Sequence, residues 1–261
     1  MANSINSNYG AQVALQNLNA TNRQLETTQN RINTSMRISS AKDNGAVFAI
    51  ATNMRANIAS LDAVQNSISR GQSLVDVALA AGEKAVTAFE ELKSVAVAIE
   101  TAPAGSAALT AYTAEYVALV AEIDAAISGA TFDGTNLFSA GAVVAVRTGL
   151  ATTATYNVGF GAAVTSGVTA TPGTSAAVQT AIEAFSARLA TLGTQSKSLE
   201  RQGVFVGKLQ DAMINGVSNL VDADLAKESA KLTALQTKQQ LGIQALSIAN
   251  SSSSALLSLF R

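Results

Sequence analysis

The sequence predicts a mainly α fold: an elongated antiparallel coiled-coil rod with paired N- and C-terminal helices and a small β-hairpin region in the middle. Apolar residues recur in alternating steps of four and three over long segments, which is the coiled-coil pattern. Only two prolines occur in 261 residues, so long helices meet few breaks. Aromatic residues make up 5% of the chain although 48% is hydrophobic, so alanine-rich helix contacts suit it better than a thick core.

Two inner segments carry the strongest heptad pattern. One apolar series runs from Met54 to Phe89, and the other runs from Val178 to Leu220. Each segment would span about 55–65 Å if it were fully helical. Because a rod of two or three helices buries such faces internally, we expect both series to pack within the subunit.

The two ends of the chain carry a weaker version of the pattern. Polar residues interrupt the series from Leu15 to Met36 and the series from Ser229 to Phe260. Two helices of about 30–40 residues with such seams are marginal by themselves. We therefore interpret the terminal series mainly as contacts between subunits, with the C-terminus ordered in a polymer. Packing within one subunit is the alternative.

The heptad phase breaks once in each half of the chain. Ser40 and Asp43 are spaced like a capping box for a new helix. In the second half, we interpret Asp222 and Asp224 as helix caps rather than metal ligands, because residues two apart point to different faces of a helix. The predicted divisions are an N-terminal helix at 1–44, helices with the β-hairpin and a loop at 45–175, a helix at 176–221 and a C-terminal helix at 222–261.

The middle of the chain holds the predicted β element. A helix is expected over 107–128, followed by a turn at Asp133-Gly134. The stretches 143–149 and 154–160 indicate short strands, and the Gly/Ser/Thr-rich segment after them indicates an exposed loop.

Composition excludes several classes of protein. The chain has neither cysteine nor histidine, which removes thiol nucleophiles, disulfides and imidazole chemistry. The adjacent Glu90 and Glu91 diverge by about 100° on a helix and cannot share a site. We therefore predict no catalytic, metal-binding or cofactor-binding residues, and no enzyme. A net charge of −1 offers nucleic acid no broad basic surface, and neither a secretory leader nor a membrane-spanning apolar run is present.

Three stretches carry a family resemblance. "RISSAKDNGAVFAIATNMRANIASL" resembles the N-terminal signature of bacterial flagellins, and "EIDAAISGATFDGTNLFSAG" is similar to a second flagellin stretch. "LVDADLAKESAKLTALQTKQQLGIQALSIANSSSSALLSLFR" is similar to the flagellin C-terminus. The resemblance covers roughly 1–140 and 176–261, and the short middle resembles the compact flagellins of alpha-proteobacteria.

The resemblance implies a structural subunit that polymerises into the bacterial flagellar filament for swimming motility. It implies export by the flagellar type III apparatus without a cleaved signal, and an extracellular location in the flagellum. The implied partners are other copies of the chain, paralogous flagellins, the flagellar cap, the junction protein, the export chaperone and the export gate. A hook–filament junction protein is the alternative, although the closing "LLSLFR" fits the filament pattern better.

The candidate site residues come from the terminal series and from the family motifs. The resemblance places core motifs at Arg31, Arg37, Lys42 and Asp43, and at the two aspartates of the second break. The predicted self-assembly interface comprises Leu15, Leu18, Leu25, Ile32, Arg31, Arg37, Asp43, Leu232, Ile243, Leu246, Leu257, Phe260 and Arg261.

A second candidate site concerns innate immunity. The stretch that faces the vertebrate flagellin-sensing Toll-like receptor in the family aligns with Phe89, Glu91, Leu92 and Ser94. An arginine usual in that stretch is replaced by Glu91 here. Since reversing the charge of a hot-spot arginine weakens binding strongly, the resemblance implies poor receptor activation.

Overall fold

The computed structural model describes the backbone of residues 8–258 and the side chains of residues 8–251. The chain divides into two compact units. We call the described residues up to 56 and from 213 onward the terminal unit, and residues 57–212 the central unit. The elements in chain order are α1 (Tyr9–Thr34), α2 (Gly45–Thr101), α3 (Ala107–Gly129), β1 (Thr131–Phe132), β2 (Thr135–Asn136), β3 (Val143–Arg147), β4 (Thr155–Gly159), α4 (Ser175–Val221) and α5 (Leu225–Ser258).

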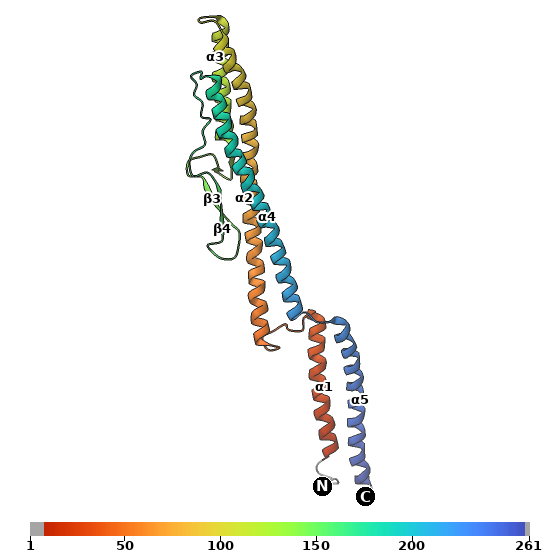
Figure 1. The fold of residues 1–261 in the computed structure, drawn as a ribbon. Helices are drawn as coiled ribbons and strands as arrows, with labels where there is room; N and C mark the ends of the chain where they lie inside the picture. Colours follow the sequence, from red (N-terminus) through yellow and green to blue (C-terminus); the bar gives the residue numbers. More distant parts are fainter. Residues whose placement is uncertain (1–7, 259–261) are drawn as a thin grey trace. The chain divides into compact units, whose positions relative to one another are not determined.

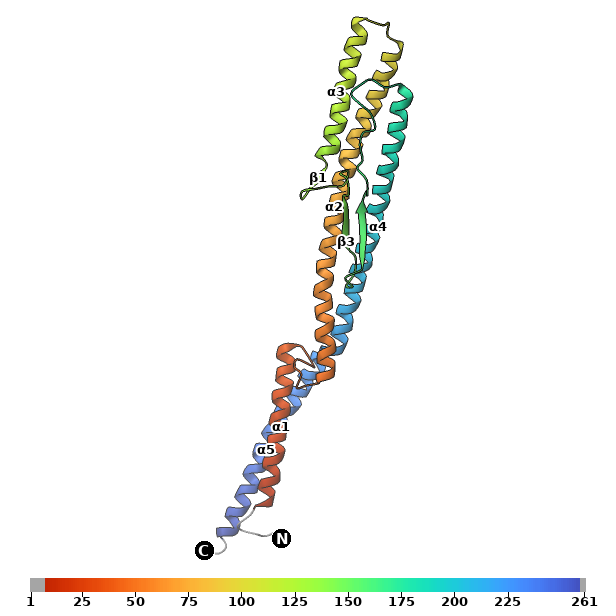
Figure 2. The ribbon, with the colours of Figure 1, turned by 90° about the vertical axis from the view of Figure 1, so that its left-hand side faces the viewer.

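The predicted mainly α fold, with paired terminal helices and a small β region, is confirmed. In the central unit α2 and α4 run antiparallel and side by side (Figures 1 and 2). No member of the two strong heptad series is exposed, so the expected packing within the subunit is also confirmed. The fully buried side chains on this seam include Leu61, Ile68, Val75, Phe89, Phe185, Leu192 and Leu199.

A glycine sets how closely α2 and α4 approach. A Cβ atom added at Gly82 would lie 2.2 Å from Cδ2 of Leu189 and 3.2 Å from its Cγ. The glycine therefore forms the hole into which the α4 leucine inserts. Near this point Phe89 and Phe185 bring their ring centroids to 5.5 Å, and Phe138 adds a third ring at 5.9 Å from Phe185.

The third helix of the central unit begins where the sequence predicts and ends one residue later. Ser106 caps it by accepting a hydrogen bond from the Leu109 amide at 3.1 Å. Four apolar residues on one face of α3 are buried, namely Tyr116, Leu119, Ile123 and Ile127. Tyr112 on the same face is 37% exposed. Within residues 8–258, no helix combines the length and apolar character that crossing a bilayer requires.

Two antiparallel hairpins complete the central unit. Asp133 and Gly134 both have positive φ, 51° and 74°, in the tight turn between β1 and β2. Strand β3 pairs with β4 from Val143 opposite Gly159 to Arg147 opposite Thr155. The β3 strand lies directly on α2, because a Cβ at Gly71 would come within 2.6 Å of Val146. The predicted strands are confirmed.

Candidate self-assembly surface

The terminal unit is built on the pairing of α1 with α5, which lie side by side in both views of the ribbon (Figures 1 and 2). Their packed positions follow alternating steps of three and four residues. The least exposed side chains of the seam are Thr21, Thr28, Glu228 and Leu235, and all four are at most 9% exposed. Half-buried positions continue the same register, namely Leu18, Leu25, Ile32, Leu232, Gln239, Gly242 and Leu246.

This register shares with the predicted series Leu18, Leu25, Ile32, Leu232, Gln239 and Leu246. At the positions between them the packed residue lies one place earlier in the chain than the predicted one. The predicted Leu15 and Ile243 lie one residue away from the packed line and are 47% and 54% exposed. The small Gly242 occupies the seam instead, and a Cβ there would lie 3.3 Å from Cδ1 of Leu18. Sequence reasoning missed the buried threonines, Glu228 and Leu235. The spacing of the sequence could have identified the α5 positions, because alternating steps of three and four from Leu232 reach Leu235, Gln239 and Gly242.

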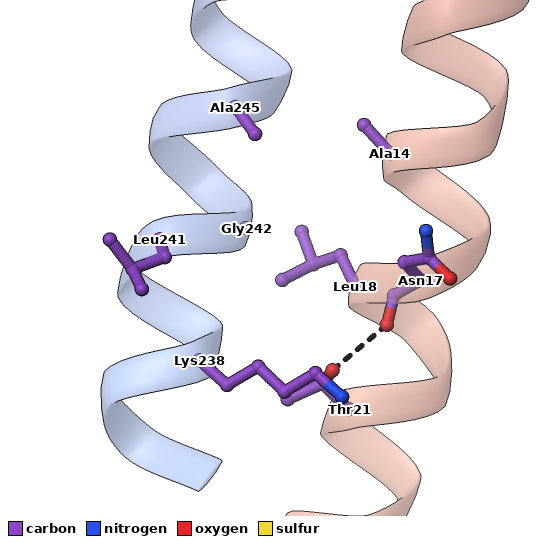
Figure 3. Close-up of a pocket in the computed structure, with 8 residues that line it drawn as sticks. All are labelled: Ala14, Asn17, Leu18, Thr21, Lys238, Leu241, Gly242 and Ala245. Atoms are coloured by element: carbon purple, nitrogen blue, oxygen red, sulfur yellow. Dashed lines mark hydrogen bonds between the residues drawn. The ribbon is translucent and has the colours of Figure 1, made fainter. Parts of the chain in front are cut away.

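The small residues leave a groove between the two helices. Figure 3 shows Leu18 of α1 reaching toward Gly242 of α5, with Ala14 and Ala245 facing each other above them, one on each helix. The open groove has a volume of about 270 Å³, and most of its wall is apolar. Lys238 crosses its lower edge beside Thr21, whose hydroxyl donates to the Asn17 carbonyl at 2.9 Å. The pair is therefore incompletely packed.

Further apolar side chains of the terminal unit face solvent. On α5, Leu241 is 59% exposed and lines the outer edge of the groove, and Ile248, two turns further along the helix, is 69% exposed. On α1, Tyr9 is 76% exposed and Val13 is 38% exposed. The α5 helix thus has apolar residues on two sides, and its partner α1 covers one of them.

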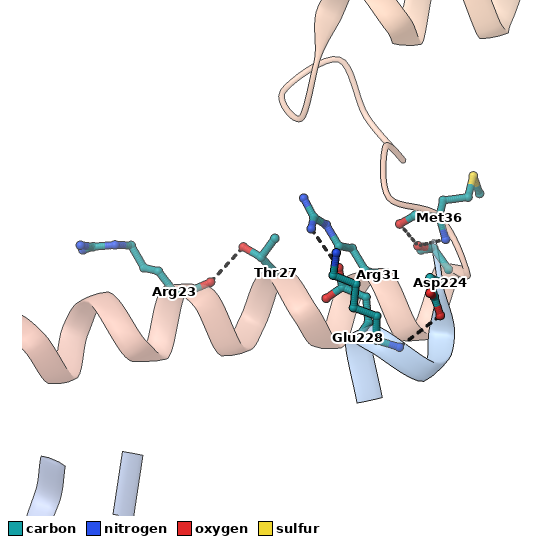
Figure 4. Close-up of polar contacts among 8 residues, drawn as sticks. Arg23, Thr27, Arg31, Met36, Asp224 and Glu228 are labelled. Atoms are coloured by element: carbon teal, nitrogen blue, oxygen red, sulfur yellow. Dashed lines mark hydrogen bonds and ion pairs between the residues drawn. The ribbon is translucent and has the colours of Figure 1, made fainter. Parts of the chain in front are cut away.

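A buried charged pair lies where α1 ends and α5 begins (Figure 4). Arg31 Nη1 lies 3.1 Å from Glu228 Oε1, and the side chains are 28% and 11% exposed. Within the described residues, Arg31 Nε, Glu228 Oε2 and Thr28 Oγ1 are buried without a hydrogen-bond partner. Charged groups inside a helix seam cost stability but fix the register of the two helices. We infer that this pair sets the alignment of α1 against α5.

The connections that leave the two helices are joined to each other. Ser35 ends α1 in a left-handed conformation with φ 56°. Met36 and Asp222 form an isolated antiparallel bridge, and the Arg37 amide donates to the Val221 carbonyl at 2.6 Å. The Arg37 guanidinium also donates to the Leu220 carbonyl at 2.8 Å. These contacts hold the two connections to each other through backbone groups.

The predicted capping box at Ser40 and Asp43 is wrong as the start of a helix. The Asp43 carboxylate accepts hydrogen bonds from the amides and hydroxyls of Ser39 and Ser40, but it closes a turn of the connection. Helix α2 begins at Gly45. It is capped by Asn44, whose side chain accepts a hydrogen bond from the Val47 amide at 3.1 Å. Hydrogen bonds from the Ser40 and Ser39 amides hold the pKa of the Asp43 carboxyl below its ordinary value.

The other predicted residues at the breaks fall in different places. Asp224 caps α5 by accepting from the amides of Ala226 and Lys227 at 3.0 and 3.1 Å. Asp222 directly follows α4, where its amide donates to the Ser218 carbonyl at 2.9 Å and its backbone forms the bridge with Met36. Lys42 is exposed in the connection. The side chain of Leu257, and Phe260 and Arg261 entirely, lie outside the described residues.

The stretch aligned with the innate-receptor site lies on α2 in the central unit. Phe89 and Leu92 are fully buried in the seam. Glu91 and Ser94 are exposed. This stretch therefore presents Glu91 and Ser94 to solvent.

Comparisons with known proteins place the chain in a family. Residues 5–142 match the bacterial flagellin N-terminal helical region, and residues 175–260 match the bacterial flagellin C-terminal helical region. The chain is 45% identical to flagellin FljK and 46% identical to flagellin FljM of Caulobacter vibrioides, with 99% of each chain covered. It is 37% identical to a flagellin of Brucella melitensis, again with 99% of each chain covered. The chain therefore belongs to the bacterial flagellin family.

Proposed function

We propose that the terminal helix pair is the surface through which this flagellin, a structural subunit of the bacterial flagellar filament, polymerises. The observation that carries the proposal is the two-sided character of α5. Its seam with α1 combines three leucines with Glu228, Gln239 and Gly242, while Leu241 at the groove edge and Ile248 remain exposed. Large apolar side chains left in water favour association with another copy.

The same proposal gives each part of the chain a place in the filament. The helices at 1–44 and 222–261 form the inner part, and the regions 45–175 and 176–221 form the outer part. One subunit meets different surfaces of its neighbours, so contacts are head-to-tail and growth stays open-ended. Within the interface we place Leu15 and Ile243, which are exposed, and we include Leu257, Phe260 and Arg261 from the C-terminal end of the sequence. The hook–filament junction alternative is not favoured, because the relatives are flagellins over nearly their whole length.

A truncation and a point variant test the assembly role together. Removing residues 251–261 and, separately, combining Leu241→Ser with Ile248→Ser should leave helical monomers that do not extend filament seeds. The control is Gln240→Ser, an exposed polar position on the same helix. Far-UV circular dichroism reports the fold, and negative-stain microscopy reports polymers. Normal elongation by both altered proteins would contradict the proposed surface.

We infer the remaining partners from family membership. The chain is exported through the flagellar type III apparatus with an export chaperone, and it is added beneath the cap above the junction protein. Two relatives from one organism support co-assembly with paralogous flagellins. We expect the chain to accumulate inside cells that lack the export gate and to appear in the medium of the parent strain.

We further propose that this flagellin activates the flagellin-sensing Toll-like receptor poorly. The exposed Glu91 and Ser94 offer no cation to the receptor, while the neighbouring Phe89 and Leu92 are buried. Glu91→Arg should raise the response of reporter cells to purified monomer. A response by the unaltered chain equal to that of an enteric-type flagellin would overturn the proposal.

A further inference from the structure

The central unit carries an outward face on α4 that combines positive charge with exposed apolar residues. Lys197, Arg201 and Lys208 are exposed along one line of the helix. Val204 and Phe205, on either side of that line, are 55% and 63% exposed. We call these five residues the basic face of α4. It lies on the side of the helix opposite the buried Leu199, Gly203 and Val206.

The central unit also carries a complementary row on α2. Asp76, Glu83 and Glu90 recur every seven residues and are all exposed. We call them the acidic row of α2. Half-buried Leu79 and Val86 lie three residues beyond Asp76 and Glu83, so apolar surface borders the row.

In the described part of the chain, no ion pair includes a residue of either surface. The ion pairs there are Arg31–Glu228, Arg70–Asp133 and Lys84–Glu122. On α2, Lys93 donates to Gln179 at 2.7 Å. The basic residues nearest to the acidic row are therefore already engaged within the subunit.

The two surfaces cannot meet within one chain because they lie at different levels of the same helix pair. Two contacts show which part of α2 lies opposite the α4 segment of the basic face. Gln210 of α4 donates to Asp62 at 2.6 Å, and Leu199 of α4 lies beside Gly71. The basic face is therefore opposite residues 62–71 of α2. The centre of the acidic row, Glu83, is about sixteen residues further along α2. At 1.5 Å per residue this offset is about 24 Å.

We propose that the basic face of α4 docks on the acidic row of α2 of a second copy of this chain, with neighbouring copies staggered by about 24 Å along these helices. The proposal rests on the proposed function, since the two copies are neighbours in the filament. Each copy offers one face and one row, so the contact is heterologous and does not close on itself. Opposite charges steer the encounter and fix the stagger, while Phe205 contributes apolar burial.

Charge reversal with rescue tests the contact. The first variant combines Lys197→Glu, Arg201→Glu and Lys208→Glu, and the second combines Asp76→Lys, Glu83→Lys and Glu90→Lys. Either variant alone should extend seeds of its own protein at least about tenfold more slowly than the unaltered chain, because like charges then face each other. The variant with all six changes should recover elongation, since it restores both complementarity and the net charge of −1. Circular dichroism of each monomer checks that the helices are retained.

Each outcome separates this inference from the proposed function. If the unaltered chain does not elongate under any seeding condition, the proposed function fails. If it elongates and either triple variant elongates equally well, the docking inference is overturned while the function stands. Failure of the six-residue variant, as a helical monomer, to recover would also overturn the inference. A filament map in which lateral neighbours bring α4 against α2 at the expected stagger supports it.

Discussion

The α2–α4 seam of the central unit and the α1–α5 seam of the terminal unit use the same heptad spacing with different side chains. The first buries large residues completely, among them Leu61, Phe89, Phe185 and Leu192. The second buries two threonines, a glutamate and a single leucine to a similar degree. The period alone therefore does not decide how firmly two helices hold each other, because the free energy gained depends on the apolar area removed from water.

The difference in buried side chains indicates which seam packs fully within one chain. The central seam satisfies its large residues within the chain, so we expect it to fold in the free subunit. The terminal seam leaves a groove at Gly242 and exposes Leu241 and Ile248. We expect the α1–α5 pair to open with a smaller free energy than the central unit, because local stability follows local burial. If the proposed assembly role is correct, contacts with a neighbouring subunit complete the packing of the terminal seam.

The largest expected effect comes from a cavity in the central seam. Leu192→Ala removes a fully buried side chain and should lower the free energy of unfolding by about 2–5 kcal/mol. Leu235→Ala removes the best-buried leucine of the terminal seam and should leave the main unfolding transition unchanged. Urea denaturation followed by circular dichroism measures both. Equal destabilisation by the two changes would show that the seams open as one cooperative unit.

The next effect concerns the buried pair of the terminal seam. Glu228→Ala strands the partly buried Arg31 and should destabilise the α1–α5 pair by about 1.5–3 kcal/mol. The double change Arg31→Met with Glu228→Leu should recover the stability of the pair but lose its unique register. Hydrogen exchange of the α1 amides measures opening, and paired spin labels on α1 and α5 measure register. A double variant with a single label distance would contradict the alignment role of the pair.

A smaller effect tests the close approach of the central helices. Gly82→Ala places a Cβ against Leu189, and the overpacking should cost about 1–3 kcal/mol. The matched control is Gly193→Ala on α4, where a Cβ meets no atom within 4 Å. There the alanine should stabilise the helix by about 0.5–1 kcal/mol. The two changes should thus shift the melting temperature in opposite directions. A higher melting temperature for both variants would mean that the Leu189 side chain moves aside freely.

The sequence predicts most of the fold for a physical reason. Long heptad series of large residues specify one buried face, so α2 and α4 could be recognised from Leu61, Phe185 and their neighbours. The third helix and the strands β3 and β4 could be recognised from the spacing of apolar residues, and the turn between β1 and β2 from the Asp133-Gly134 dipeptide. These signals are local, and the structure realises them nearly where the sequence places them.

The sequence predicts the terminal seam less well because small and polar residues fill it. Leu15 and Ile243 are large and apolar, so the sequence predicts them as seam positions although both are exposed. Thr28 and Gly242 do pack in the seam, but their residue types do not mark them as core positions. The pairing of Arg31 with Glu228, 197 residues apart, depends on the register of two separate helices. The cap at Asn44 was missed because Ser40 and Asp43 carry the capping-box spacing but close a turn instead.

The smallest expected effect lies in the connection between α1 and α2, where neither seam contributes. The pKa of the Asp43 carboxyl is lowered from 3.8 by hydrogen bonds from the Ser40 and Ser39 amides. A lowered pKa in the folded state means that the ionised carboxylate stabilises the turn above pH 3.8, and that this contribution is lost as the pH falls through the lower folded value. Amide exchange at Ser39 and Ser40 should therefore accelerate in acid relative to neighbouring amides, and Asp43→Asn should remove the pH dependence. If the exchange ratio stayed constant across this range in the unaltered chain, the carboxylate would be dispensable, and the neighbouring Met36–Asp222 bridge would suffice to hold the connection.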